Sequence, residues 1–226
     1  SRKRSQETAM RPNNLSSCNV SPWWNRARYR VYAPVYDWLA WPLEPGRGEA
    51  MEALAPRASE RTLVLGCGTG LDVRHLPVET PVTLVDAVPA MVRRARRRAA
   101  ARGMTGQARV ADARALPFGQ NAFDLVLLHS FLSVVSAPVA ALRETARVLA
   151  PGGRVSIYDK FVPLGTQPAC LRRALNPLAR LFVSDFLCRL EPMLTAAGYE
   201  TEAHRRVGLG GVYSATVARP TLPRNK

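Results

Sequence analysis

The chain has few cysteines, few acidic residues and no long apolar run. Its four cysteines form no C-x-x-C pair, which argues against a metal site and predicts reduced thiols, as in a cytoplasmic protein. No stretch approaches the roughly 18 apolar residues that a membrane-spanning helix needs. The polar start is not followed by the apolar core of a secretory signal. We therefore expect a cytoplasmic chain that does not cross a membrane.

Basic residues far outnumber acidic ones. Lys and Arg number 32 against 17 Asp and Glu, which gives a formal net charge of +15. Such a charge attracts polyanions, either nucleic acid or an anionic membrane surface. The excess is almost all arginine, and its densest run lies at residues 93–98. On a helix these arginines wrap around more than one side, so a solvated helix without a partner is the alternative.

A glycine-rich stretch at residues 63–70, LVLGCGTG, is the most informative motif. It predicts a buried strand that runs into a turn with glycines at 66, 68 and 70. A residue without a Cβ atom takes positive φ easily and lets a ligand approach the backbone. The G-x-G-x-G spacing differs from that of a P-loop and from the G-x-G-x-x-G of a dinucleotide site. Alone, the motif indicates only a strand-to-helix turn.

Polar residues follow the next predicted strands. Asp86 ends a strand at 81–86, where a carboxylate is placed to accept both ribose hydroxyls of a nucleoside. Further strands are predicted at 108–113, 121–129, 154–158, 199–206 and 211–219, with a turn at 150–153. Helices are predicted at 47–54, 89–102, 138–149 and 186–197. Asp112 and His129 fall at strand ends, so both should meet the glycine turn in the crevice beyond the sheet.

Five segments together resemble the class I S-adenosylmethionine-dependent methyltransferases in order and spacing, over about residues 45–219. They are LGCGTG (65–70), LVDAVPAMVRRAR (84–96), ADARALPF (111–118), FDLVLLHS (123–130) and RVLAPGGRV (147–155). The resemblance implies an α/β fold: a Rossmann-like, seven-stranded, doubly wound sheet with its last strand antiparallel, here with an N-terminal helical extension. It also implies S-adenosylmethionine as cofactor and S-adenosylhomocysteine as product.

The resemblance assigns a cofactor site without a metal. Its residues are Gly66, Cys67, Gly68, Gly70, Asp86, Ala87, Met91, Asp112, Ala113 and His129. The glycines would line the methionine end, Asp86 would hold the ribose, and Asp112 would meet the adenine amine. The family's usual acid two residues before the first glycine is Val64 here. Asp72 is either a substitute for that acid or simply an acid favoured in a first helical turn.

Methyl transfer from a sulfonium needs alignment and exclusion of water more than a strong acid–base pair. The catalytic candidates are His129, Tyr32 and Tyr36. His129 would accept the proton of an amine nucleophile, or would instead orient backbone or water at a strand end. Tyr32 and Tyr36, with Tyr158, would form an aromatic wall that stabilises a cation.

The chain divides into a flexible basic tail at 1–20, an aromatic-rich helical segment at 21–60, a methyltransferase domain at 61–219 and a tail at 220–226. All four tryptophans lie in the second segment, interleaved with arginines. That mixture is typical of a membrane interface, and a lid over the cofactor is the alternative. A basic apolar segment at 171–183 is another candidate for lipid contact or for a wall of the substrate pocket.

Three segments, at 29–37, 44–48 and 176–191, resemble bacterial phosphatidylethanolamine N-methyltransferases and, for the first two, the related quinone-biosynthesis C-methyltransferases. The resemblance implies a membrane lipid as acceptor, phosphatidylethanolamine first. C-methylation of a quinone precursor or another small molecule is the alternative. A non-catalytic lipid- or RNA-binding protein on this fold is the alternative of another class. We expect an anionic membrane surface as partner, at the inner face of the membrane, and no nucleic acid.

Overall fold

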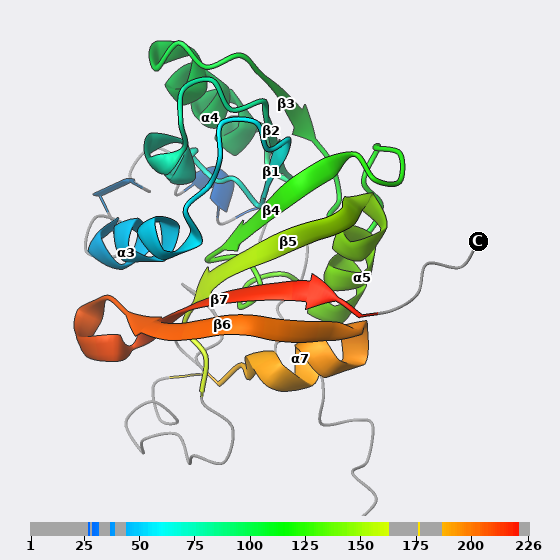
Figure 1. The fold of residues 1–226 in the computed structure, drawn as a ribbon. Coiled ribbons are helices and arrows are strands. Elements are labelled where there is room, and N and C mark those ends of the chain that lie inside the picture. Colours follow the sequence, from blue (N-terminus) through cyan, green and yellow to red (C-terminus); the bar gives the residue numbers. More distant parts are fainter. Residues whose placement is uncertain are drawn as a thin grey trace, which may run out of the picture.

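A seven-stranded sheet organises the molecule (Figure 1). The structure, a computed structural model, describes residues 27, 29–31, 37–38, 44–162, 176 and 187–221. The strands are β1 (Thr62–Leu65), β2 (Val82–Asp86), β3 (Gly106–Val110), β4 (Phe123–His129), β5 (Leu149–Asp159), β6 (Tyr199–Val207) and β7 (Tyr213–Pro220). Their order is β3-β2-β1-β4-β5-β7-β6.

The strand directions confirm the predicted topology. The first five strands pair in parallel, whereas β7 is antiparallel to both β5 and β6. A short 3-10 turn, η4 (Leu209–Gly211), joins β6 to β7. Gly208, Gly210 and Gly211 all take positive φ there, which a hairpin this tight requires. The last strand therefore turns back along β6, as the glycine-rich link predicts.

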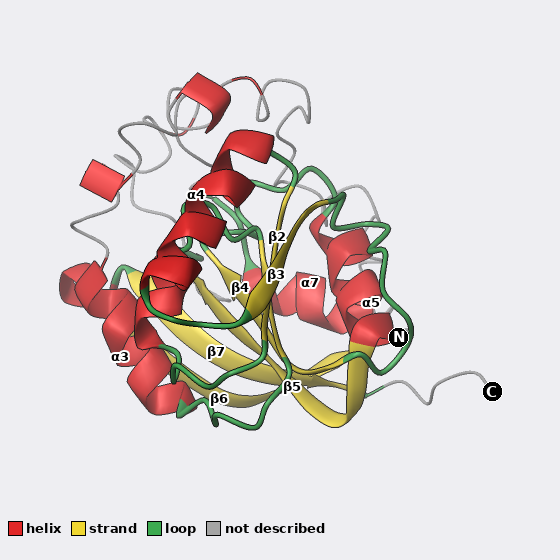
Figure 2. Ribbon diagram, turned by 90° about the horizontal axis from the view of Figure 1, so that it is seen from above, coloured by secondary structure: helices red, strands yellow, loops and turns green. Residues whose placement is uncertain are grey.

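Helices cover both faces of the sheet (Figure 2). They are α3 (Glu44–Leu54) and α4 (Pro89–Ala101) on one face, and α5 (Pro138–Val148) and α7 (Leu190–Ala197) on the other. Alternate residues of β1 separate the two cores, because successive side chains of a strand point to opposite faces. Leu63 and Leu65 pack on the α5 and α7 side, and Val64 packs on the α3 and α4 side.

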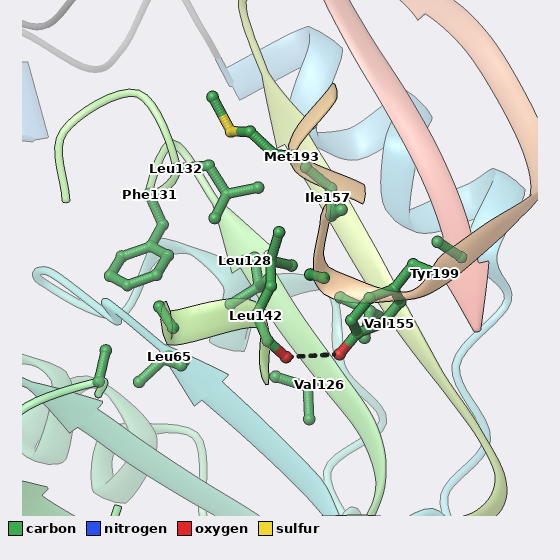
Figure 3. Packing of buried hydrophobic residues seen from close by; sticks show 14 of the residues in the cluster. Leu65, Val126, Leu128, Phe131, Leu132, Leu142, Val155, Ile157, Met193 and Tyr199 are labelled. Carbon is green, nitrogen blue, oxygen red and sulfur yellow. Dashed lines mark hydrogen bonds between the residues drawn. The ribbon is translucent and has the colours of Figure 1, made fainter. Parts of the chain in front are cut away.

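The core on the α5 and α7 side is continuous from the sheet to both helices (Figure 3). Leu142 of α5 is fully buried among Val126, Val155 and other strand residues. Its carbonyl oxygen accepts a hydrogen bond of 2.9 Å from the Tyr199 hydroxyl. This bond satisfies a buried polar group and fixes the start of β6 against α5.

Several predicted boundaries are wrong. β5 begins at Leu149 rather than 154, and the expected turn at 150–153 is an irregular part of the strand, with Gly152 at φ 75°. Helix α7 begins at Leu190 rather than 186, because Arg189 before it is extended. Strand β3 ends at Val110, so Asp112 lies beyond the strand. In the other helices the boundaries differ from the prediction by three residues or fewer.

Cys188 is fully buried and disulfide-bonded, with its partner outside the described residues. The expectation of four reduced thiols is therefore wrong for Cys188. The inference of a cytoplasmic location from reduced thiols does not extend to this cysteine. Cys67 is free. Among the described residues no helix is long and apolar enough to span a bilayer. The tail at 1–20, the segment at 171–183 except residue 176, and residues 222–226 lie outside the described residues.

Replacing Leu142 by alanine tests the buried core. The cavity left among Val126 and Val155 should lower the free energy of unfolding by about 2–5 kcal/mol, measured by urea denaturation. Val78→Ala is the matched control, since Val78 is 41% exposed and its loss should change stability by less than about 0.5 kcal/mol. Equal effects of the two changes would contradict this account of the core.

Candidate functional site

The turn after β1 has the backbone that its glycines predict. Gly66, Gly68 and Gly70 take φ values of 70°, 52° and 83°. A Cβ atom on Gly66 would overlap the Phe131 ring, and one on Gly70 would lie 2.9 Å from Ala95 Cα. Both conformation and space therefore exclude larger residues at these two positions.

Asp86, at the end of β2, holds this turn in place. Its carboxylate accepts hydrogen bonds from the backbone N–H groups of Gly68, at 2.9 Å, and Val88, at 2.8 Å. Burial raises the pKa of Asp86 above its ordinary value, and the backbone donors oppose that rise. The carboxylate thus lies between the glycine turn and the start of α4.

A cleft opens beside Asp86, beyond the carboxyl ends of β1, β2, β3 and β4. It encloses about 890 Å³ of empty space, its open mouth included. Seven of the ten residues predicted to bind the cofactor line it: Gly66, Gly68, Asp86, Ala87, Met91, Asp112 and Ala113. The topology therefore brings together, in one place, residues from three separate strand ends, as expected for a doubly wound sheet.

The other three predicted residues lie behind the cleft. Cys67 is buried in the core on the α3 and α4 side, and Gly70 packs against Ala95. The His129 side chain is fully buried: Nδ1 donates to Asp72 at 2.6 Å, and Nε2 lies 3.0 Å from Ser156 Oγ. Both ring nitrogens are engaged within the protein, which favours the orienting alternative for this residue.

Of the three tyrosines predicted to form an aromatic wall, the structure describes one. Tyr32 and Tyr36 lie outside the described residues. Tyr158 is fully buried and stacks on Tyr213, with ring centroids 5.1 Å apart. Burial raises the pKa of its hydroxyl well above the ordinary value. Tyr158 is therefore a core residue behind the cleft and does not line it.

A buried ionic network underlies the glycine turn. Asp72 lies in η3 (Leu71–His75), the 3-10 helix after the turn, and accepts from Arg47 Nη1 at 2.5 Å as well as from His129. Although burial alone would raise the pKa of Asp72, Arg47 and His129 hold it well below the usual range. Asp72 therefore faces Arg47 and His129, while Val64 fills the position of the family's usual acid as a buried apolar residue.

Sequence reasoning missed several residues that line the cleft. Ser130 and Phe131 follow β4, and Arg114 and Tyr29 also line the cleft. Arg114 pairs with Asp112, with Nη2 2.6 Å from Oδ2. Ser130 has a positive φ of 53°, and its buried hydroxyl has no hydrogen-bond partner among the described residues. The positive φ of a serine has no sequence signal, since serine rarely adopts that conformation.

The segment before α3 attaches to the glycine turn. The Asp37 carboxylate accepts from Thr69 Oγ1 and from the Arg98 guanidinium of α4. Burial would raise the pKa of Asp37, but these two donors lower it. Arg98 also donates to the Thr69 carbonyl at 3.0 Å. Tyr29 packs on Val88 and Met91, so the described parts of this segment lie along α4 at the edge of the cleft.

The chain is similar in sequence to known proteins. The family described as "Methyltransferase domain" matches residues 63–157. The "Uncharacterized methyltransferase YodH" of Bacillus subtilis is 31% identical over 77% of this chain and 69% of its own length. The "Ubiquinone/menaquinone biosynthesis C-methyltransferase UbiE" of Ruegeria sp. is 36% identical over 71% of this chain and 74% of its own length. The chain belongs to the class I S-adenosylmethionine-dependent methyltransferases.

Further relatives differ in the reaction that their names describe. The "Phosphatidylethanolamine N-methyltransferase" of Cereibacter sphaeroides is 35% identical over 56% of this chain and 64% of its own length, so the chain spans less than two thirds of it. The solved structure of the "[4+2]-Cyclase SpnF" superposes with a TM-score of 0.68 at 20% identity, covering 90% of this chain and 98% of that one. That likeness shows the fold alone. Membership of the methyltransferase family implies S-adenosylmethionine as cofactor.

Acid should destabilise this methyltransferase through Asp72. Because its pKa in the folded protein lies below the value of about 3.9 for a free aspartate, the pairing stabilises the fold above about pH 5 and is lost as the pH falls further. Asp72→Asn should lower the free energy of unfolding by about 3–5 kcal/mol at pH 7, with a smaller difference near pH 3. Urea denaturation across this pH range measures both values.

Asp124→Asn is the control, because Asp124 forms a partly exposed pair with Arg61. It should cost no more than about 1 kcal/mol. A difference for Asp72→Asn that stays constant from pH 7 to pH 3 would contradict the role given to this carboxylate.

Proposed function

We propose that the cleft binds S-adenosylmethionine and that the protein transfers its methyl group to a membrane lipid, phosphatidylethanolamine first. The observation that carries the cofactor assignment is the Asp86 carboxylate, held beside the glycine turn by the Gly68 and Val88 N–H groups. A carboxylate in this position, partly buried in a cleft at the strand ends, fits a ribose that presents two hydroxyls.

The rest of the lining fits the other parts of the cofactor. Val88 and Met91 offer an apolar surface for an adenine ring, and Asp112 offers a carboxylate for its amine. Gly66 lets the Phe131 ring pack closely against the turn, where a Cβ atom would overlap it. Val64 supplies no charge for the methionine ammonium, and Asp72 is paired with Arg47 and His129.

The bound cofactor would supply an activated methyl group on a sulfonium. The protein's part is then to align the acceptor and exclude water. Phe131, Val134 and Val135 form an apolar wall of the cleft. The Ser130 hydroxyl is a polar group of that wall without a partner in the described part of the chain, so we assign it to positioning the acceptor. The role of His129 as proton acceptor stays a prediction.

Several observations favour a lipid acceptor. The relatives include proteins named for phosphatidylethanolamine N-methylation and for quinone C-methylation, and both acceptors reside in membranes. The net charge of +15 favours an anionic surface, which would place the protein at the inner face of the membrane. A quinone precursor is the second candidate, on the UbiE likeness. A non-catalytic binding protein is the candidate of another class, motivated by Val64.

Calorimetric titration with S-adenosylhomocysteine tests the cofactor site. We expect micromolar binding that Asp86→Ala weakens at least about tenfold, since the two ribose hydrogen bonds are lost. Glu200→Ala is the matched control: it removes an exposed carboxylate on β6, away from the cleft, and should leave the affinity unchanged. No binding to folded wild-type protein up to millimolar ligand would favour the binding-protein alternative.

Transfer of a labelled methyl group tests the acceptor. With detergent-dispersed phosphatidylethanolamine, label should enter the lipid fraction, and Ser130→Ala should raise KM for the lipid while leaving S-adenosylhomocysteine affinity unchanged. Label found only in a quinone precursor would replace phosphatidylethanolamine by the second candidate.

A further inference from the structure

The outward side of α4 is an arginine face. Met91, Val92, Ala95 and Ala99 turn toward the core. At about 100° per residue, Arg93, Arg94, Arg96 and Arg97 share an arc of about 160° on the opposite side, and all four are exposed. The fifth arginine of the run, Arg98, instead turns to Thr69 and Asp37. The run therefore occupies more than one side of the helix, as expected from the sequence, but four of its five charges share one side.

The charge of the arginine face is not neutralised locally. Residues 87–111 contain seven arginines and no aspartate or glutamate. None of the four outward arginines forms an ion pair with another described residue. An anion that approaches this side of the molecule therefore meets unpaired guanidinium groups and no opposing carboxylate on the helix.

Exposed apolar side chains lie on, or next to, segments that contact α4. Trp38 is 77% exposed and follows Asp37, which is bound to Arg98 of α4. Val31 is 72% exposed and lies two residues after Tyr29, which packs against Met91 at the start of α4. Val110 is 51% exposed at the end of β3, the strand against which α4 packs (Figure 1). Most large exposed apolar residues of the described chain are thus attached to elements that contact this helix.

We propose that the arginine face, together with Trp38, Val31 and Val110, docks on an anionic phospholipid bilayer. Arginine side chains bind lipid phosphates, tryptophan favours the depth of the headgroups, and exposed aliphatic side chains gain from leaving water. A nucleic acid would satisfy the arginines but would leave the two valines in water.

Docking in this orientation would bring the cleft to the lipid. The helix begins at the cleft, whose lining includes Val88 and Met91 of this region and Tyr29 of the preceding segment. A headgroup held at the arginine face would therefore be next to the mouth. This step rests on the proposed lipid substrate, whereas docking itself does not require the protein to methylate anything.

Sedimentation with vesicles tests the docking surface. The probe is the full chain with vesicles of phosphatidylethanolamine and phosphatidylglycerol, in the absence of cofactor. The combined change Arg93→Glu, Arg94→Glu and Arg97→Glu should weaken binding by about 100-fold or more, since each arginine near such a surface contributes about fivefold. Binding of the wild-type protein should fall with salt, and neutral phosphatidylcholine vesicles should bind it far less.

The matched control reverses three exposed arginines elsewhere: Arg57→Glu, Arg205→Glu and Arg206→Glu. The control variant has the same net charge as the α4 variant. Its affinity for the vesicles should therefore fall only a few-fold, through the loss of long-range attraction. Equal losses in the two variants would overturn the proposal, because net charge and not this surface would then control binding. Unchanged vesicle binding in the α4 variant, with loss of binding to RNA, would overturn it in favour of a nucleic acid.

Two readouts separate this proposal from the proposed function. Calorimetry with S-adenosylhomocysteine shows that the α4 variant is folded with its cofactor site intact. Methylation of detergent-dispersed phosphatidylethanolamine needs no bilayer, so its absence, with vesicle binding retained, rejects the lipid substrate and supports the docking surface. Methylation in detergent, with vesicle binding that the α4 variant keeps, supports the enzyme and rejects the surface.

Discussion

The carboxyl edge of the sheet depends on one buried negative charge that is paired on two sides. An isolated carboxylate as deeply buried as Asp72 would cost several kcal/mol. Arg47 of α3 and His129 of β4 both donate to it, and each is itself buried. Three elements are thus fixed relative to one another beneath the glycine turn. The turn can then present its backbone to a ligand without reorganising when the ligand arrives.

The same pairing explains why the acid expected before the first glycine can be absent without loss of the fold. Position 64 points into an apolar core between α3 and α4, where a carboxylate would need a buried partner. The chain places valine there and places its buried acid after the turn, opposite an arginine. Asp72 is paired with Arg47 and His129, so its carboxylate is engaged within the protein.

Local patterns made much of the fold predictable. Apolar runs and helix-starting prolines gave β1, β2, β4, α4 and α5 nearly in full, because these signals act over a few residues. The start of β5 at Leu149 was not predictable, since it depends on pairing with Phe123. The environment of His129 depends on Asp72 and Ser156, which lie far away in the sequence. The separation of Arg98 from the other arginines of α4 likewise depends on Asp37, which is distant in the sequence.

The close approach of Gly70 to Ala95 couples the position of the glycine turn to that of α4. A Cβ atom on Gly70 would lie 2.9 Å from the Ala95 backbone, and Arg98 of α4 donates a hydrogen bond to the carbonyl of Thr69 in the same turn. The helix cannot shift along the sheet without moving the turn. Any ligand of the outer side of α4 that displaced it would change cofactor affinity, and the cofactor would change the affinity of that ligand by the same factor. A surface on the outer side of α4 and a pocket at the start of the same helix would thereby share one equilibrium.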